Sequence, residues 1–188
     1  MRIIAGTFRS RPLQAPAGLA TRPTSDRLRE TLFNVLAPRI VGAYFVDLYA
    51  GSGAVGLEAL SRGAERVVFV ERAPAPLKAL RTNLEKLGVK DGFSIHGSVR
   101  EFLRKAQSGS RGFDVVFLDP PYDAAEEYSA TLGVLGTADA RLLAEGAVVI
   151  AEHRRKEKLE DRYGSLARTR LLEQGDAALS FYSATKQD

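Results

Sequence analysis

The chain has 188 residues, 45% of them hydrophobic and 27% charged, so it is long enough to bury one sizeable core. It contains no cysteine, which excludes disulfides and thiolate-ligated metal sites. No stretch approaches the roughly 18 consecutive apolar residues of a membrane span, and the N-terminus lacks the apolar core of a secretory signal. We therefore expect a cytoplasmic protein without a metal site or a membrane partner.

The positive charge of the chain is concentrated near its N-terminus. The net charge is +4, yet seven arginines and two acids give residues 1–40 a charge of +5, so the remaining residues carry −1. An arginine excess of this kind is typical of a surface that binds nucleic-acid phosphates. The arginines that precede the first predicted helix, and that we expect to contact RNA, are Arg2, Arg9, Arg11 and Arg22.

The first 40 residues predict a small hairpin followed by a helix. Arg2–Ala5 and Pro12–Ala15 are strand-like and are separated by a turn. Thr24 or Ser25 can cap a helix whose apolar residues recur at helical spacing until Pro38. We expect residues 1–40 to form a basic extension of the domain that follows, residues 41–188.

From residue 44 onward the apolar pattern alternates between strands and helices. The predicted strands are Tyr44–Leu48, Arg66–Val70, Phe93–His96, Phe113–Leu118, Ala147–Ala151, Leu166–Leu172 and Ala177–Ala184. The predicted helices are Ala54–Ser61, Pro76–Leu87, Val99–Ala106 and Ala124–Leu135. Repeated strand–helix–strand units indicate an α/β fold with a doubly wound, mainly parallel sheet of seven strands. The last two strands flank a turn sequence and predict a C-terminal antiparallel hairpin.

A glycine-rich loop joins the first of these strands to its helix. Gly51-x-Gly53-x-x-Gly56 matches the dinucleotide fingerprint, so an NAD site is one interpretation. Asp47, however, ends the strand beside the place where a pyrophosphate would lie, and its carboxylate suits a cationic group such as an ammonium or a sulfonium. Glu71 ends the second strand and is placed to accept hydrogen bonds from two ribose hydroxyls. Enzymes that use NAD and those that use S-adenosylmethionine share this last feature.

The tetrapeptide Asp119-Pro120-Pro121-Tyr122 follows a buried strand. Two successive prolines hold the backbone extended and leave its carbonyl groups free. The Asp119 carboxylate and the Pro120 carbonyl can accept both hydrogens of an –NH₂ group, which directs the nitrogen lone pair toward an incoming methyl carbon. Tyr122 offers a face on which a flipped-out base can stack, which stabilises binding by about 1–3 kcal/mol. The pattern predicts Asp119, Pro120 and Tyr122 as catalytic residues for methylation of a base amine.

In this order, residues 47–53, Glu71 and residues 119–122 resemble class I S-adenosylmethionine-dependent methyltransferases that act on exocyclic amines. Arg2–Gly6 and Arg22–Asn34 are similar to the same regions of the RsmD-type methyltransferases, which make N2-methylguanine in small-subunit ribosomal RNA. The resemblance spans nearly the whole chain.

The resemblance implies a Rossmann-like fold, S-adenosylmethionine as cofactor, and ribosomal RNA or a small-subunit particle as partner. Its implied cofactor-binding residues are Asp47, Tyr49, Ala50, Gly51, Ser52, Gly53, Glu71, Arg72 and Ser98. Ser98 would lie near the adenine ring, where such enzymes commonly have an acidic residue that this chain lacks.

Three other functions remain open on the sequence. An adenine-N6 methyltransferase shares the tetrapeptide but usually needs a further domain to read its target. A cofactor-binding RNA-binding module without turnover would not require Asp119 and Tyr122. An NAD oxidoreductase would use the same glycine fingerprint.

Overall fold

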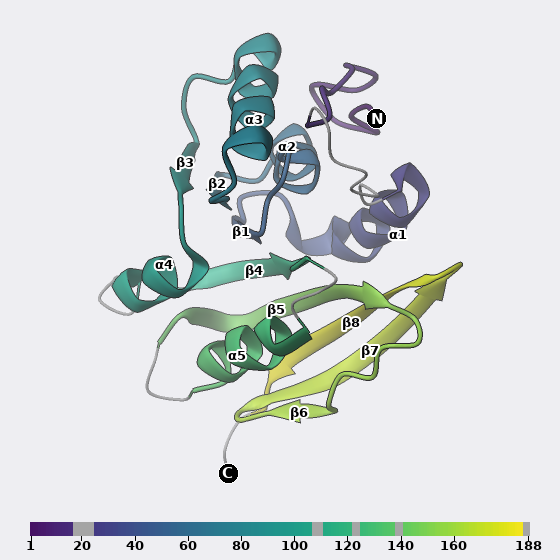
Figure 1. The fold of residues 1–188 in the computed structure, drawn as a ribbon, viewed down its shortest axis with the longest axis vertical. Coiled ribbons are helices and arrows are strands. Elements are labelled where there is room, and N and C mark those ends of the chain that lie inside the picture. Colours follow the sequence, from purple (N-terminus) through teal and green to yellow (C-terminus); the bar gives the residue numbers. More distant parts are fainter. Residues whose placement is uncertain (17–24, 107–110, 122–124, 138–140, 186–188) are drawn as a thin grey trace.

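The computed structural model describes residues 1–16, 25–106, 111–121, 125–137 and 141–185 (Figure 1). The predicted site residues Arg22 and Tyr122, and the candidate cap Thr24, lie outside these ranges. Within the described part, no helix is long and apolar enough to cross a membrane.

The described residues form one sheet of eight strands in the order β3-β2-β1-β4-β5-β8-β7-β6 (Figure 1). The strands are β1 (Tyr44–Leu48), β2 (Arg66–Val70), β3 (Phe93–His96), β4 (Phe113–Leu118), β5 (Leu143–Arg154), β6 (Arg162–Tyr163), β7 (Leu166–Gln174) and β8 (Ala177–Ala184). The pairings from β3 through β5 are parallel, whereas β8, β7 and β6 add antiparallel pairs at one side. The predicted fold class, a mainly parallel sheet that ends in an antiparallel hairpin, is confirmed.

Two strands differ most from the prediction, while β7 extends two residues past its predicted end. The two-residue β6 was not predicted, because no run of apolar residues marks it in the sequence. β5 has 12 residues where the apolar run predicted five, because its polar ends still pair through the backbone. Beyond the end of β4 it continues alongside β8, from the pair Glu152↔Leu179 to the pair Arg154↔Ala177.

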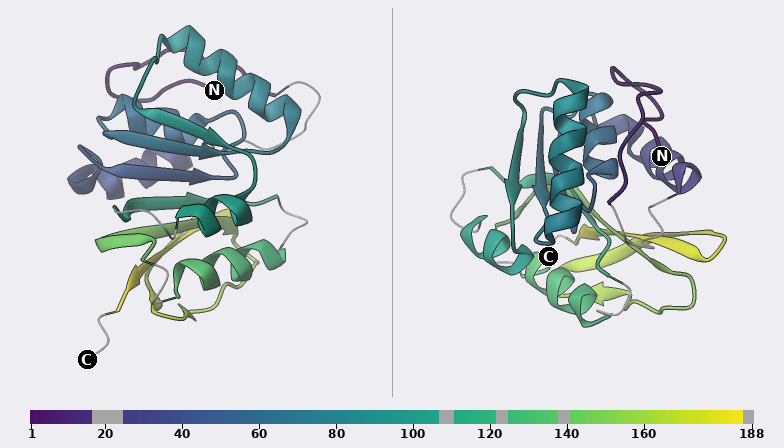
Figure 2. Two further views of the ribbon diagram at one scale, coloured as in Figure 1. Left: turned by 90° about the vertical axis from the view of Figure 1, so that its left-hand side faces the viewer. Right: turned by 45° about the horizontal axis from the view of Figure 1, so that its top comes forward.

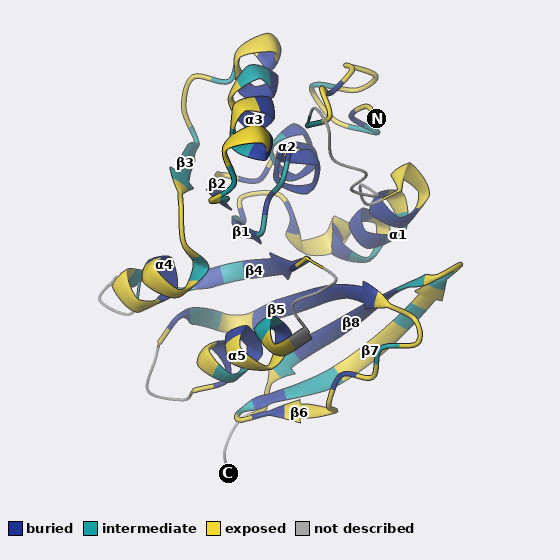
Figure 3. Cartoon of the chain, in the orientation of Figure 1, coloured by how far each residue is buried: buried dark blue, intermediate teal, exposed yellow. Residues whose placement is uncertain are grey.

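Helices cover both faces of the sheet (Figure 2). They are α1 (Asp26–Leu36), α2 (Ala54–Ser61), α3 (Pro74–Leu87), α4 (Val99–Ala106) and α5 (Ala125–Leu135), with a 3₁₀ turn at Ala37–Arg39. Alternate strand residues point to opposite faces, so the sheet has two cores. Phe45 and Phe69 pack on α1, α2 and α3, whereas Val46 and Val68 pack on α4 and α5. Figure 3 shows this as buried strands beneath helices that are exposed on their outer surfaces, except for α2, which is buried along most of its length.

The N-terminal arm, residues 1–16, packs on α2. Its predicted strands are reduced to a single bridge, Arg2↔Pro12. Around this bridge, Ile3 N donates to the Arg11 carbonyl at 3.0 Å and Leu13 N donates to the Met1 carbonyl at 3.1 Å. Ile4 N and Ala5 N donate instead to the two Glu58 carboxylate oxygens of α2 at 2.8 and 3.0 Å, so the pairing does not continue. The arm turns at Gly6, where an added Cβ would lie 1.8 Å from the Ser61 carbonyl oxygen, so only glycine fits.

A buried ion pair connects the arm to two helices. Arg29 of α1 and Glu58 of α2 are both fully buried, with the Arg29 Nε 3.8 Å from a Glu58 oxygen. Arg29 also donates to the Arg2 carbonyl, and Arg62 Nε donates to Glu58 at 2.7 Å. The side chain of Ile3 belongs to the same apolar core as α1 and α2. The division of the chain near residue 40 stays a prediction.

Candidate functional site

The candidate site lies along one edge of the sheet, where the parallel strands end together. Leu48 pairs with both Val70 and Leu118, and Leu118 pairs with Ala151. The residues that follow these four strand positions therefore meet at the same edge, which is where ligands bind in open α/β sheets. The structure thus brings together three sets of predicted residues: the glycine loop, Glu71, and Asp119 with Pro120.

The glycine loop turns tightly between β1 and α2. Gly53 has φ +82°, and a Cβ there would lie 2.4 Å from a Leu80 methyl group, so a side chain meets both strain and a clash. Ala50 N donates to the Val70 carbonyl at 2.9 Å and fixes the loop on β2. From α3, the buried Asn83 side chain donates to the Ser52 carbonyl at 3.0 Å. Asn83 was not predicted as a site residue, and no motif marks it.

Glu71 lies against this loop. One carboxylate oxygen accepts from Gly51 N at 2.9 Å and the other from Ala73 N at 2.6 Å. Each oxygen retains a second lone pair, so the fixed carboxylate can still accept hydroxyl groups of a ligand. Its neighbour Arg72 is exposed. The roles of both residues in cofactor binding stay predictions.

Ser98 is exposed at the start of α4. Its hydroxyl oxygen accepts a 3.4 Å hydrogen bond from Glu101 N, which is the contact of a helix cap. A role near an adenine ring stays a prediction for this residue.

Tyr49 connects the glycine loop to α5. It adopts φ +64°, and its hydroxyl donates to the Glu127 carboxylate at 2.7 Å while lying 3.0 Å from the Thr131 hydroxyl. Burial raises the pKa of Tyr49 well above its ordinary value, so it remains a donor. Glu127 and Thr131 were missed by the sequence analysis. The only available signal was their spacing of four residues, which places them on the same side of a helix.

Buried carboxylates give the site its electrostatic character. Asp47 is 2% exposed and accepts from Gly56 N at 2.8 Å; burial, and then the charges of Glu71 and Glu152, raise the pKa of Asp47 to about 7. Asp119 is partly exposed, but desolvation of its carboxyl group, and then the charges of Glu152 and Asp47, raise its pKa well above the ordinary value. Among the described residues, neither Asp47 nor Asp119 forms an ion pair. The site is therefore prepared for a cationic ligand and disfavours a pyrophosphate.

Glu152 was also missed by the sequence analysis. It is 4% exposed and follows directly after the apolar run of β5, just as Asp119 follows β4. A charged residue at the carboxyl end of a buried strand was the signal that could have found it.

The arginines of the arm lie away from this edge. Arg2, Arg9 and Arg11 are all exposed. Arg9 is in the tip of the arm, next to Phe8, whose N–H donates to the Ser61 hydroxyl at the far end of α2. Arg11 donates a long hydrogen bond of 3.5 Å to the Lys86 carbonyl near the end of α3. Their phosphate-binding role stays a prediction.

Two surface hollows lie elsewhere on the molecule. One, of about 280 Å³, is lined by residues at the amino ends of the strands, including Ala43 and Ala147. The other, of about 400 Å³, lies between Phe8 of the arm and the loop Gly88–Gly92. Neither contains a predicted site residue.

Comparison with known proteins connects this arrangement to a family. The family described as "Conserved hypothetical protein 95" matches residues 1–183. A Bacillus subtilis protein named "Putative rRNA methyltransferase YlbH" is 36% identical over 97% of this chain and 98% of its own length. The Escherichia coli protein "Ribosomal RNA small subunit methyltransferase D" is 45% identical over 65% of this chain and 60% of its own length.

A solved structure is similar over the whole chain. It is described as "Putative methyltransferase yhhF from Escherichia coli" and aligns with a TM-score of 0.85 and 35% identity. The alignment covers 100% of this chain and 99% of that one. The arm, the glycine loop and the edge that bears Asp119 therefore all fall within the shared fold.

Proposed function

Because the chain belongs to the family described as "Conserved hypothetical protein 95", the RsmD-type methyltransferases, we propose that it methylates the exocyclic N2 amine of a guanine in small-subunit ribosomal RNA. The methyl donor in this proposal is S-adenosylmethionine, and the place of action is the cytoplasm. The observation that carries it is the position of Asp119 and Pro120 on the same sheet edge as the glycine loop.

The residues of this edge fit S-adenosylmethionine. The loop at Gly51 is open, since a Cβ built there meets nothing within 4 Å. Glu71 stands beside it as an acceptor for ribose hydroxyls, and the buried Asp47 supplies negative charge for a cationic ligand. When bound, the cofactor supplies an electrophilic sulfonium methyl group. We assign Asp47, Glu71 and the loop residues Tyr49–Gly53 to its binding.

In this proposal, Asp119 and Pro120 hold the target amine. The carboxylate and the prolyl carbonyl accept its two hydrogens, which turns the nitrogen lone pair outward and fixes the direction of attack. The amine nitrogen becomes acidic as its new bond forms, and the raised pKa of Asp119 makes this carboxylate a suitable acceptor for the released proton. Tyr122, outside the described residues, would stack on the base.

The proposal is tested by analysing ribosomal RNA from cells with and without the gene. We expect N2-methylguanosine to disappear from one position of the small-subunit RNA in the deletion strain, and the purified enzyme to restore it. Loss of N6-methyladenosine instead would indicate the adenine-N6 alternative. Unchanged nucleosides, together with no transfer in vitro, would refute the proposal.

The arm is proposed as a phosphate-binding surface. Neutralising Arg2, Arg9 and Arg11 by substitution with Gln should flatten the slope of log RNA affinity against log salt by about 2, since each contact to single-stranded RNA contributes about 0.7. Cofactor affinity, measured by calorimetry, should not change. A salt slope equal to that of the wild type would show that the arm does not bind the RNA backbone.

A further inference from the structure

The strand β5 extends past the neighbour that carries the catalytic carboxylate. Leu118 ends β4 and pairs with Ala151, but β5 continues to Arg154, three residues or about 10 Å further. The next residues form a turn with four cations and one acid, Arg154–Lys158, which we call the basic turn. It therefore projects from the same sheet edge at which Asp119 lies.

The backbone of the basic turn is held in place. Arg155 N donates to the Asp176 carbonyl at 2.8 Å, Glu157 N donates to the Arg154 carbonyl at 2.9 Å, and a His153 ring nitrogen lies 2.9 Å from that same carbonyl oxygen. These contacts tie the turn to the β7–β8 hairpin, so its position relative to the site is fixed.

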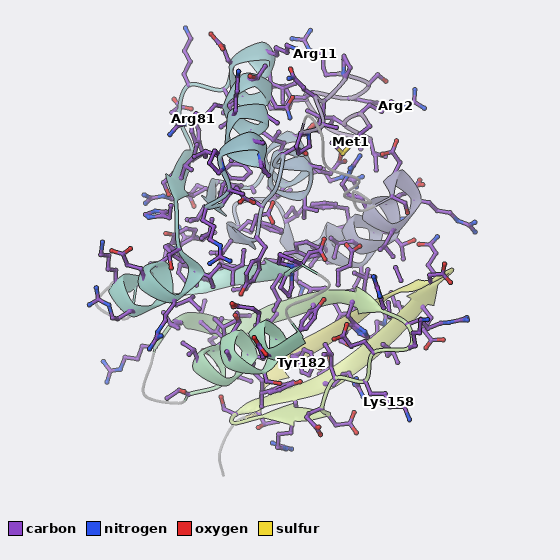
Figure 4. All side chains as sticks on the ribbon, viewed as in Figure 1. Met1, Arg2, Arg11, Arg81, Lys158 and Tyr182 are labelled. Atoms are coloured by element: carbon purple, nitrogen blue, oxygen red, sulfur yellow. The ribbon has the colours of Figure 1, made fainter. Side chains whose placement is uncertain are left out.

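Three cationic side chains of the basic turn are available to a partner. Arg155, Lys156 and Lys158 are exposed, and within the part of the chain that the structure describes none of them forms an ion pair. Figure 4 shows Lys158 beside β7, across the molecule from Arg2 and Arg11 of the arm. Glu157 and Asp176 are the acids whose backbone groups bond to the turn. The four cations of the turn outnumber these two acids, so the local charge remains positive.

The two basic regions lie on opposite sides of the sheet edge at which the chemistry is proposed. The arm tip lies at the far end of α2, an eight-residue helix about 12 Å long that begins at the glycine loop and runs away from the edge. The basic turn, in contrast, projects about 10 Å beyond the end of β4, a length of about three base-pair steps along the axis of a nucleic-acid helix.

We propose that the basic turn binds the phosphates of the RNA next to the base that Asp119 receives. This inference rests on the proposed function and adds to it a specific contact surface. The turn would fix the RNA backbone on one side of the target while the arm contacts it at a distance. Phosphate contacts position a nucleic acid without reading its sequence, so the effect should be on binding and not on the choice of base.

The test is the double variant Arg155→Gln, Lys156→Gln. Its matched control is Arg104→Gln, Arg141→Gln, which removes the same charge from two exposed residues, one in the last turn of α4 and one just before the start of β5. Each variant is assayed with a transcript of small-subunit ribosomal RNA and with the assembled small-subunit particle. RNA binding is measured at several salt concentrations without cofactor, and methyl transfer is measured separately.

We expect the basic-turn variant to raise KM for RNA roughly tenfold and to flatten the salt slope by about 1.4, with kcat and cofactor affinity unchanged. The control should behave like the wild type. Equal RNA affinity and salt slope in both variants and the wild type would overturn the proposal, and so would an equal loss in both variants. If the wild type transfers no methyl group, the proposed function fails, but the salt slopes still decide whether the turn binds RNA.

Discussion

Two groups of carboxylates in this protein differ in how far neighbouring residues compensate their charge. Glu58, beneath the arm, accepts from Ile4 N, Ala5 N and Arg62, and lies beside the buried Arg29. Asp47 and Asp119, at the sheet edge, face other carboxylates, and no cation in the described residues contacts them. The Glu58 carboxylate has hydrogen-bond donors and an opposite charge within the fold, whereas Asp47 and Asp119 have no opposite charge among the described residues.

The difference distinguishes a buried carboxylate that the fold stabilises, Glu58, from the carboxylates of the candidate site. Burial of a charge costs free energy unless hydrogen bonds and an opposite charge offset it, and the fold supplies both at Glu58. At Asp47 the cost is only partly offset, by a single backbone hydrogen bond from Gly56. Carboxylates with raised pKa values of this kind are concentrated at functional sites, because selection for stability alone favours their replacement.

Asp119→Ala gives the sharpest contrast between the two groups. It should reduce methyl transfer by about 10²–10⁴-fold, since the amine loses its acceptor, while cofactor affinity and the melting temperature stay close to those of the wild type. Single-turnover kinetics and calorimetry measure the two effects. Turnover within threefold of the wild type would contradict the role of Asp119 in catalysis.

Glu58→Ala should show the reverse pattern, a loss of stability without a direct effect on chemistry. Removing this partner leaves Arg29 buried and two arm N–H groups without acceptors, so we expect the free energy of unfolding to fall by about 3–5 kcal/mol in urea titrations. The control is Asp26→Asn, which removes the 48%-exposed partner of Arg29 and should cost less than about 1 kcal/mol. Equal costs for the two variants would show that burial does not distinguish these pairs.

Asp47→Asn tests the cost of the unpaired carboxylate. A folded-state pKa of about 7 lies above the unfolded value, so the native protein binds the proton more tightly, and its stability falls as pH rises from about 4 to about 7. The asparagine variant lacks this fall and should be more stable at pH 8 by about 2–4 kcal/mol, yet bind the cationic cofactor more weakly. Melting temperatures of both proteins between pH 5 and pH 8 check this. Parallel curves would mean that Asp47 titrates normally.

Glu71→Ala should have the smallest effect of the four, a loss of about 1–3 kcal/mol in cofactor binding from missing hydrogen bonds to ribose. Because Glu71 also accepts from Gly51 N, Glu71→Gln serves as the matched control that keeps one acceptor for the loop. Unchanged affinity of the alanine variant in calorimetry would reject the ribose assignment.

The sequence predicted those parts of the molecule that local chemistry determines. The apolar alternation located every strand of the parallel sheet, and the motifs located the glycine loop, Glu71 and Asp119. Glu152, Asn83 and the pair Glu127–Thr131 were not predicted. They reach the site through strand register and helix packing, which bring together residues 30 to 100 positions apart and leave no local pattern. The arm was predicted as two strands because the sequence alone does not show that the N–H groups of Ile4 and Ala5 bond to α2.

The docking of the arm is determined mainly by the helices beneath it. Apart from the buried Ile3 and Leu13 and the obligatory Gly6, the arm docks mainly through backbone groups, and the side chains that bind them are Glu58, Ser61 and Asn83. Positions 2, 9 and 11 are therefore free to diverge among relatives without loss of the fold. A library randomised at these three positions should yield mostly folded proteins that differ in RNA affinity, so the arm is a surface on which substrate preference can evolve independently of stability.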